Sequence, residues 1–176
     1  MTTIVTRSGK GSALTHAEMD ANFVNLNTAK PDSVVERLSS AATTTLSTAV
    51  NTNLSIPVAA NRNYYFEAIL VVQCSSTGGV KVAVNGPASA TVVAHAIGNS
   101  TSATAQTSTV FTALSTLSSV NFCAVATTNH GIRVNGTMSV GATAGNLVIQ
   151  FAATTAGQTA TVQAGSALVV IEAANV

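Results

Sequence analysis

Charged residues are scarce in this chain of 176 residues, and so are the aromatic residues on which many binding sites depend. Asp, Glu, Lys and Arg make up 7% of the sequence and the net charge is +1, whereas roughly a quarter of the residues in an ordinary domain are charged. Tryptophan is absent, and aromatic residues make up 4%. A chain this neutral has no basic surface for nucleic acid or anionic lipid, so we expect neither as a partner.

Long apolar runs are missing as well. No stretch reaches the roughly 20 residues of a membrane-spanning helix, and the opening MTTIVTRSGK has no apolar segment of signal-peptide length. We therefore expect no membrane partner. The two cysteines, Cys74 and Cys123, each lie in a strand-like run. Without a secretion signal, two buried reduced thiols are a better interpretation than a disulfide.

Motifs for cofactors and metals are not found. Gly9-Lys10-Gly11-Ser12 lacks the earlier glycine of a phosphate-binding loop, and we interpret it as a flexible lead. The three histidines have no Cys, Asp or Glu at ligand spacing; they are His16, His95 and His130. We predict no cofactor and no metal site.

Carboxylates are too few to suggest catalysis. Beyond residue 38 only Glu67 and Glu172 remain, so acid–base chemistry would depend on that one pair. Glu67 is better explained as an ion-pair partner of Arg62, Lys81 or Arg133. We predict that the chain is not an enzyme and has no catalytic residues.

The few charges are concentrated at the start of the chain. Eight of the thirteen lie in the first 37 positions, and the rest of the chain is rich in Thr, Ala, Ser and Val. Surface charge normally keeps a protein dispersed, so we expect the neutral part to be covered by copies of itself or by a larger structure. We divide the chain into an N-terminal arm, residues 1–38, and a β body, residues 39–176.

The arm contains one strong helix signal. Thr15 and Glu18 have the spacing of a capping box, and Leu14 and Met19 have the spacing of a hydrophobic staple. These pairs predict one short α-helix over residues 15–27. At about a dozen residues the helix would be marginal alone in water, so it needs a groove, a neighbouring protomer or its own β body to cover its apolar side.

We expect that apolar side to be the anchor of the arm, since its residues follow helical spacing. It consists of Leu14, Met19, Phe23 and Leu26. The lead, residues 1–13, has little periodicity and is expected to be extended. Residues 33–40 are expected to form a weak further helical turn.

The body has the pattern of an all-β domain. The strongest strand is Tyr64–Gln73, whose continuous apolar middle predicts burial on both faces. Asn135-Gly136 between alternating runs predicts a type I′ hairpin. Further strands are predicted at residues 54–58, 80–84, 91–97, 108–114, 120–126, 147–151, 159–162 and 167–172. Strands at this spacing with Gly and Asn turns indicate an antiparallel β-sandwich, jelly-roll-like in type.

Two parts of the sequence resemble virion proteins of tailed bacteriophages. Residues 8–30, SGKGSALTHAEMDANFVNLNTAK, are similar to a segment of the type SGKGSPLTHAEVDANFTNLN near the start of many phage tail, fibre and head-associated proteins. Ala13 and Met19 stand where Pro and Val are common in that segment. Residues 46–173 are similar to a β module of phage structural proteins, with elements IPVAANRNYYFEAILVV, GGVKVAVNGPASATVV, GIRVNGTMSVGATAGNLVIQFA and TATVQAGSALVVIEA in matching order.

The resemblance implies a structural protein of the virion, assembled in the bacterial host cytoplasm, with a β-sandwich body that forms a homotrimer. The leading interpretation is a capsid decoration or cement protein bound to the major capsid protein. The alternative is a short tail fibre, appendage or baseplate component, bound to a tail protein and involved in host attachment.

Overall fold

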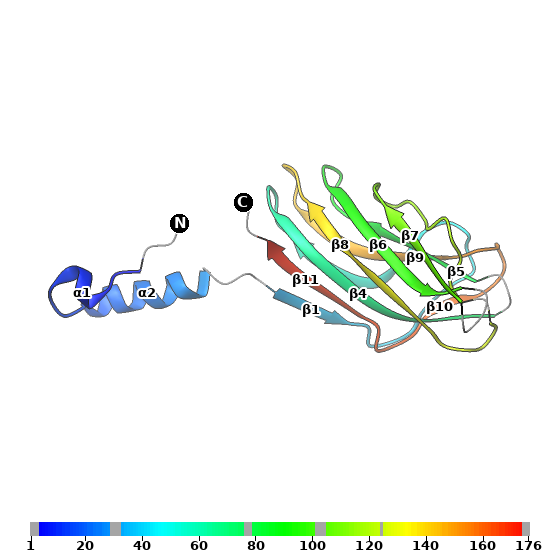
Figure 1. Ribbon diagram of the computed structural model, residues 1–176, viewed down its shortest axis with the longest axis horizontal. Coiled ribbons are helices and arrows are strands. Elements are labelled where there is room, and N and C mark those ends of the chain that lie inside the picture. Colours follow the sequence, from blue (N-terminus) through cyan, green and yellow to red (C-terminus); the bar gives the residue numbers. More distant parts are fainter. Residues whose placement is uncertain (1–3, 29–32, 76–78, 101–104, 124, 174–176) are drawn as a thin grey trace. The chain divides into compact units, whose positions relative to one another are not determined.

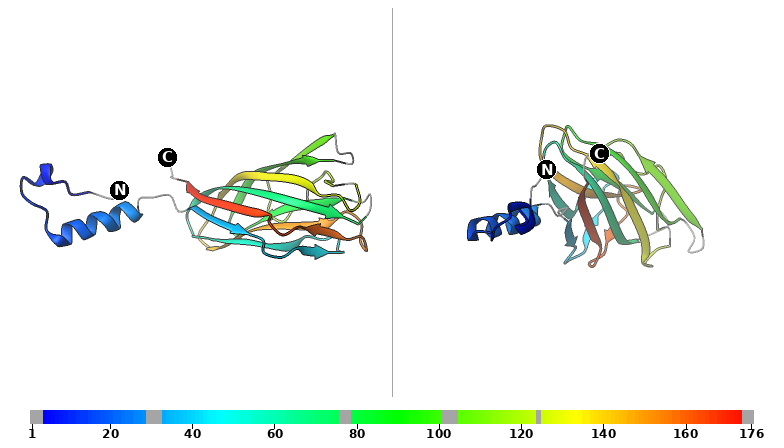
Figure 2. Two further views of the ribbon diagram at one scale, coloured as in Figure 1. Left: turned by 90° about the horizontal axis from the view of Figure 1, so that it is seen from below. Right: turned by 60° about the vertical axis from the view of Figure 1, so that its left-hand side comes forward.

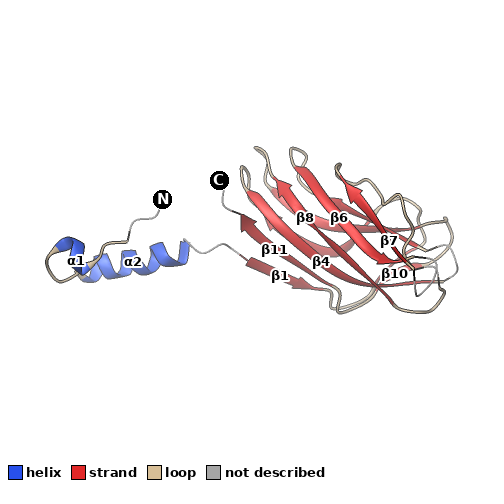
Figure 3. Ribbon diagram, in the orientation of Figure 1, coloured by secondary structure: helices blue, strands red, loops and turns tan. Residues whose placement is uncertain are grey.

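The computed structural model of the chain describes residues 4–28, 33–75, 79–100, 105–123 and 125–173, with the backbone alone for 26–28. Its contacts divide the chain into two units, Met1–Asp32 and Ser33–Val176. In the part that the structure describes, helices occur in the first unit and strands in the second (Figure 3). None of the described helices is both long and apolar enough to span a membrane.

The N-terminal unit contains two helices, α1 (Arg7–Lys10) and α2 (His16–Thr28). Helix α2 confirms the predicted helix to within a residue at each end. The single turn of α1 corrects the expectation of a fully extended lead. Thr6 caps this turn by accepting a hydrogen bond from Gly9 N, and Gly11 ends it in the left-handed conformation at φ 72°, which glycine adopts without steric cost.

The second unit is an antiparallel β-sandwich, which confirms the predicted fold class. Its strands are β1 (Ser33–Arg37), β2 (Ala42–Thr44), β3 (Val50–Val58), β4 (Asn63–Cys74), β5 (Val80–Asn85), β6 (Thr91–Asn99), β7 (Gln106–Phe111), β8 (His130–Ser139), β9 (Gly145–Ala153), β10 (Ala160–Val162) and β11 (Ala167–Ala173). Eight strands form a large sheet and three form a small one.

The large sheet has the strand order β1-β11-β4-β8-β6-β7, and these strands lie side by side in that order in Figure 1. Two strands pair with the same edge of β4: β11 pairs with its first part and β10 with its last three residues. Strand β2 pairs with the other edge of β10. The small sheet has the order β3-β9-β5 and lies behind the large one; Figure 2 shows the twist of these layers from two further directions.

Alternation along β4 determines which side chains enter the core. Its even-numbered residues are buried and point toward the small sheet, whereas its odd-numbered residues lie on the outer face. The buried set is Tyr64, Phe66, Ala68, Leu70, Val72 and Cys74. The prediction that this strand is buried on both faces is therefore wrong, because the small sheet covers one face of β4 only.

The predicted hairpin at Asn135-Gly136 is also wrong. Both residues lie in the middle of β8, which pairs with β4 on one side and with β6 on the other. Gly136 lies opposite Phe66 and Ala94, and a Cβ added there would lie 2.4 Å from the Val93 carbonyl oxygen. The glycine is needed for close strand approach, and two ladders of hydrogen bonds override the local turn preference of the Asn-Gly pair.

Two further expectations are corrected. Residues 33–37 form strand β1 rather than a helical turn, because Val34 and Val35 favour a strand and pair with β11. The β unit therefore begins at Ser33, before the predicted boundary at residue 39. The segment 120–126 forms no strand in its described part beyond an isolated bridge between Val80 and Phe122, since Cys123 takes a left-handed φ of 58° that ends the extended run.

Candidate interaction surfaces

The start of α2 is held by a reciprocal capping box, as predicted. Thr15 N–H donates to Glu18 Oε2 at 2.7 Å, and Glu18 N–H donates to Thr15 Oγ1 at 3.2 Å. Lys10 forms an ion pair with the same carboxylate. The hydrogen bond from Lys10, with further hydrogen bonds from the backbone and hydroxyl of Thr15, lowers the pKa of Glu18 to about 2.

The lead folds back on α2 through a second reciprocal pair. Val5 N–H donates to Asn22 Oδ1 at 2.9 Å, and Asn22 Nδ2 donates to the Val5 carbonyl at 2.8 Å. Within the segment that resembles phage proteins, these bonds and the Lys10–Glu18 pair engage Lys10, Thr15, Glu18 and Asn22. These side chains, with the Thr6 cap, help to organise the fold of the unit.

The predicted anchor residues lie on the exposed surface of this unit, as far as their side chains are described. Phe23 is 71% exposed, Met19 is 38% exposed and Leu14 is half-buried, while Leu26 lies in the last turn, where only the backbone is described. Val24, which the prediction omitted, is 60% exposed. It lies about 100° around the helix from Phe23, so the exposed apolar surface of α2 is wider than the predicted stripe.

A second group of exposed apolar side chains lies on the outer face of the large sheet, and no pattern in the sequence predicted it. Four large apolar side chains on β1, β4, β6 and β7 point away from the core: Val35, Ile69, Val93 and Val110 are 57–66% exposed. Half-buried Val169 and Ile171 of β11 join them, because Val169 lies opposite Val35 and Ile171 lies opposite Tyr65. We call this surface the outer face.

The centre of the outer face carries one ion pair. Arg133 Nε lies 2.9 Å from Glu67 Oε1, Arg133 Nη2 donates to Glu67 Oε2 at 3.0 Å, and Tyr65 Oη donates to the same Oε2 at 3.2 Å. The Arg133 guanidinium holds the pKa of Glu67 below its usual range despite the opposing effect of desolvation. The predicted pairing of Glu67 with one of the nearby cations is confirmed, and the pair leaves the centre of this surface without net charge.

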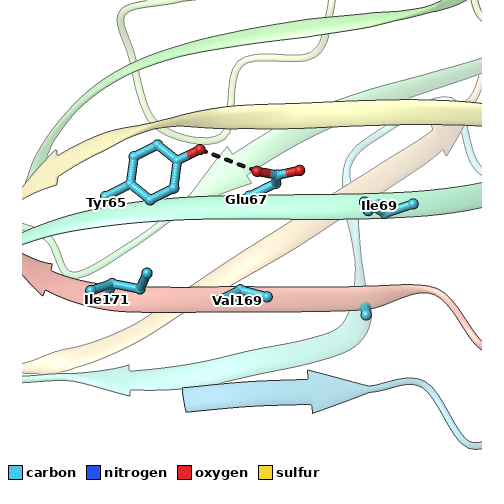
Figure 4. Close-up of a pocket in the computed structure, with 6 residues that line it drawn as sticks. Tyr65, Glu67, Ile69, Val169 and Ile171 are labelled. Carbon is cyan, nitrogen blue, oxygen red and sulfur yellow. Dashed lines mark hydrogen bonds between the residues drawn. The ribbon is translucent and has the colours of Figure 1, made fainter. Parts of the chain in front are cut away.

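A shallow depression of about 300 Å³ crosses β4 and β11 on this face. Figure 4 shows its side chains on one side of the sheet, with the Tyr65–Glu67 hydrogen bond along its rim. Its lining consists of Tyr65, Glu67, Ile69, Ala167, Val169 and Ile171. It is open and almost wholly apolar, so it suits packing against another protein surface better than it suits orienting a small polar molecule.

The outward residues of the small sheet are different in kind. They include the exposed amides Asn51, Asn53 and Asn146, beside the buried Gln150. Gln150 Nε2 donates to Asn51 Oδ1 at 2.9 Å. The two outer surfaces of the sandwich therefore differ, since one carries exposed large apolar side chains around an ion pair and the other carries exposed amides.

The two carboxylates considered for catalysis do not face each other. Glu67 lies opposite Val169 on the outer face, whereas Glu172 lies opposite the inward-facing Tyr64. Since successive residues alternate between faces, these carboxylates point to opposite sides of the sheet, and Glu172 pairs with Arg62 at 3.1 Å. In the described part of the chain, no three side chains of His, Cys, Asp or Glu gather in one place.

Comparisons with known proteins identify no family for this chain. No family model and no curated protein matches the sequence. Among solved structures, the VP2 subviral particle of infectious bursal disease virus is similar over 82% of this chain, with 12% identity and a TM-score of 0.23. The Gt strain of the same virus is similar over 84%, with 12% identity and the same TM-score. The chain spans 38% of the length of either protein, and a likeness this weak carries no argument about function.

Proposed function

We propose that this chain is a structural protein of a bacteriophage virion, and that its N-terminal unit anchors it in the particle. The observation that carries the proposal is the arrangement of polar and apolar side chains in the segment that resembles phage virion proteins. Lys10, Thr15, Glu18 and Asn22 form hydrogen bonds or an ion pair within the unit, whereas Phe23 is 71% exposed and Val24 is 60% exposed. An exposed phenylalanine on a short, capped helix is the kind of residue that fills a partner's pocket.

Preorganisation supports the anchoring role. A helix of this length would be marginal alone, and ordering it at the moment of docking would cost free energy. The capping box and the Asn22–Val5 pair already fix the backbone, so less conformational entropy remains to be lost on binding. The apolar side chains can then contribute most of their burial free energy to affinity.

Within the virion, we favour a capsid decoration or cement protein over the alternative of a short tail fibre, appendage or baseplate component. A cement protein acts mechanically, because each copy buries area across neighbouring capsomers at roughly 25 cal/mol per Å² of apolar surface. A single β unit with one anchor unit suffices for that role. Copy number distinguishes the two assignments, since hundreds of copies per particle indicate the head and a few tens indicate the tail.

Self-association is the second part of the proposal, with the outer face as the contact and a homotrimer as the assembly. The outer face is about 24 Å wide, because six adjacent strands are separated by five spacings of about 4.8 Å, and the strands are about 26 Å long on average. Its projected area is therefore roughly 600 Å². Each partner contributes roughly 800 Å² to a standard interface, which is of similar size. The Glu67–Arg133 pair is already neutralised, so copies can approach without like-charge repulsion.

The anchor is tested by Phe23→Asp, with Ala21→Asp as the matched control on the opposite side of α2. Burial of a Phe side chain stabilises a contact by about 2 kcal/mol, so occupancy of particles lacking this protein should require roughly 30-fold more of the Phe23→Asp chain. Quantitative binding to such particles measures the effect. Equal binding by both variants, or a wild-type chain that binds no particle, would refute the anchor.

A further inference from the structure

Cys74 and Cys123 face each other in the core. Cys74 is the last residue of β4 and Cys123 follows the bridge residue Phe122, yet their Sγ atoms are 3.4 Å apart. Both thiols are free and buried, which confirms the prediction of buried reduced thiols. The proximity of two cysteines 49 residues apart in the sequence could not be predicted from the sequence.

The backbone holds the two side chains in this position. Cys123 adopts a left-handed φ of 58°, which is uncommon for a residue other than glycine and persists only where the surroundings impose it. Its N–H donates to the Asn99 carbonyl at 3.1 Å, and Phe122 N–H donates to the Val80 carbonyl at 2.8 Å. The backbone of Cys74 is held as well, because Thr127 N–H donates to the Cys74 carbonyl at 2.9 Å.

We propose that Cys74 and Cys123 are an oxidisable dithiol, which closes to an intramolecular disulfide when the chain meets a hydroperoxide and reopens with a thiol reductant. The sulfurs need to approach from 3.4 Å to the bonded distance of about 2.05 Å, a change that side-chain rotation and small backbone shifts can supply. The proposal concerns the chain by itself and does not rest on the virion assignment.

The chemistry proceeds in two balanced steps. The Cys74 sulfur attacks the peroxide, the O–O bond breaks, and Cys74 sulfenic acid and water form. The Cys123 sulfur then attacks the sulfenic sulfur; the S–S bond forms, the S–OH bond breaks, and the hydroxide leaves as water with the thiol proton of Cys123. Two thiols and one hydrogen peroxide become one disulfide and two waters.

The order of the steps follows from burial. Cys74 is 4% exposed and Cys123 is 0% exposed, so the oxidant reaches Cys74 first. Burial, with a further effect from the neighbouring Cys74, raises the pKa of Cys123 to about 12, so Cys123 stays a thiol until its partner becomes electrophilic. Since thiolates are the reactive species, we expect oxidation to be slow compared with that of an exposed cysteine.

Closure would link the two sheets. Cys74 belongs to β4 of the large sheet, and the segment of Cys123 pairs through Phe122 with β5 of the small sheet. A covalent link across 49 residues restricts the unfolded chain. We expect the melting temperature of the oxidised chain to exceed that of the reduced chain by about 10 °C.

The experiment uses the full chain, purified under reducing conditions and divided between dithiothreitol and hydrogen peroxide. After peroxide, titration of thiols in denaturant should find none, and a non-reducing peptide map should show the Cys74–Cys123 link. The melting temperature should rise in the wild-type chain and not in Cys74→Ala or Cys123→Ala. Dithiothreitol should then restore both thiols and the lower melting temperature.

Three results would overturn the proposal: two free thiols after peroxide has oxidised an exposed-cysteine control protein, sulfinic or sulfonic acid in place of a disulfide, or disulfides between chains. A disulfide without a rise in melting temperature would overturn the link between the sheets. The peptide map of the wild-type chain decides the main question even where an alanine variant fails to fold.

Discussion

Two glycines of β8 differ in what surrounds them. A Cβ at Gly136 would lie 2.4 Å from the Val93 carbonyl oxygen and 2.6 Å from Ala94 Cα, whereas a Cβ at Gly131 would meet no atom within 4 Å. The conflict at Gly136 involves backbone atoms, which cannot rotate aside. Close strand approach therefore requires a glycine at position 136 but not at position 131.

We predict that Gly136→Ala lowers the free energy of unfolding by about 2 kcal/mol, the usual cost of overpacking, while Gly131→Ala changes it by less than about 0.5 kcal/mol. Denaturant unfolding of the two variants measures the difference. Equal stability of the two variants would show that β4 and β6 can separate around β8 without cost.

Glu18 makes the N-terminal unit sensitive to acid. Its pKa in the folded unit is lowered from 4.5 to about 2, chiefly by the hydrogen bond from Lys10. A carboxyl with a lowered pKa stabilises the fold above its unfolded pKa. That stabilisation is therefore complete above about pH 4.5 and is lost as the pH falls toward 2.

We predict a midpoint near pH 2 when the carboxyl carbon of Glu18 is followed by NMR, with the amide shifts of α2 changing over the same range. Glu18→Gln should keep α2 largely formed and remove the acid transition of its first turn. A Glu18 midpoint near the ordinary value of 4.5 would mean that Lys10 and Thr15 do not hold the carboxylate in solution.

Among the strands, β4 contributes most to the outer face. Ile69 stands at its middle, 57% exposed, with Glu67 beside it on the same face. A charge at Ile69 would have to be buried on self-association, which costs several kcal/mol unless a partner charge compensates it. The same charge would remain solvated in a monomer.

We predict that Ile69→Asp weakens self-association at least tenfold and leaves the unfolding midpoint of the separated chain unchanged. Asn146→Asp adds the same charge among the amides of the small sheet and should leave association intact. Sedimentation equilibrium over a range of concentrations measures both. If the wild-type chain stays monomeric throughout, or Ile69→Asp assembles like the wild type, the outer face is not the contact.

The same strand shows what the sequence could and could not predict. Apolar and β-branched runs identified β4, β5, β6, β9 and β11, because a strand must place such residues on at least one packed face. The continuous run in β4 predicted two buried faces, yet one is open. Glu67 within that run was the available signal, since a charge at an odd-numbered position marks the outward face. Which face is covered depends on long-range pairing, and local pattern does not reveal it.

Local signals succeeded in the N-terminal unit and failed at Asn135-Gly136 for one physical reason. The capping box joins Thr15 and Glu18, three residues apart, and local sequence contains everything that it needs. The Asn-Gly pair has an equally local preference, but β8 gains hydrogen bonds from strands on both sides. Of the candidate surfaces, the shared helix face of Met19 and Phe23 could be predicted from spacing, whereas the outer face required the sheet order.

At the scale of the whole molecule, the two units divide the tasks that we propose. No residue among 4–25 is buried, and the core is built from residues 38–170. The hydrophobic core of the β unit is therefore built without residues of the described part of the N-terminal unit. Anchoring and self-association are assigned to surfaces on different units, so one can be removed without the other.

We predict that the chain 33–176 keeps the melting temperature of the full chain to within a few degrees, and keeps its self-association, while it fails to bind particles lacking this protein. Each result depends on a different part of the molecule. Folding depends on the core, self-association on the outer face, and anchoring on Phe23 with its neighbours. Differential scanning calorimetry, sedimentation and particle binding measure the three separately. A truncated chain that still occupies particles fully would place the attachment on the β unit, and one that unfolds would show that the first 32 residues support the sandwich.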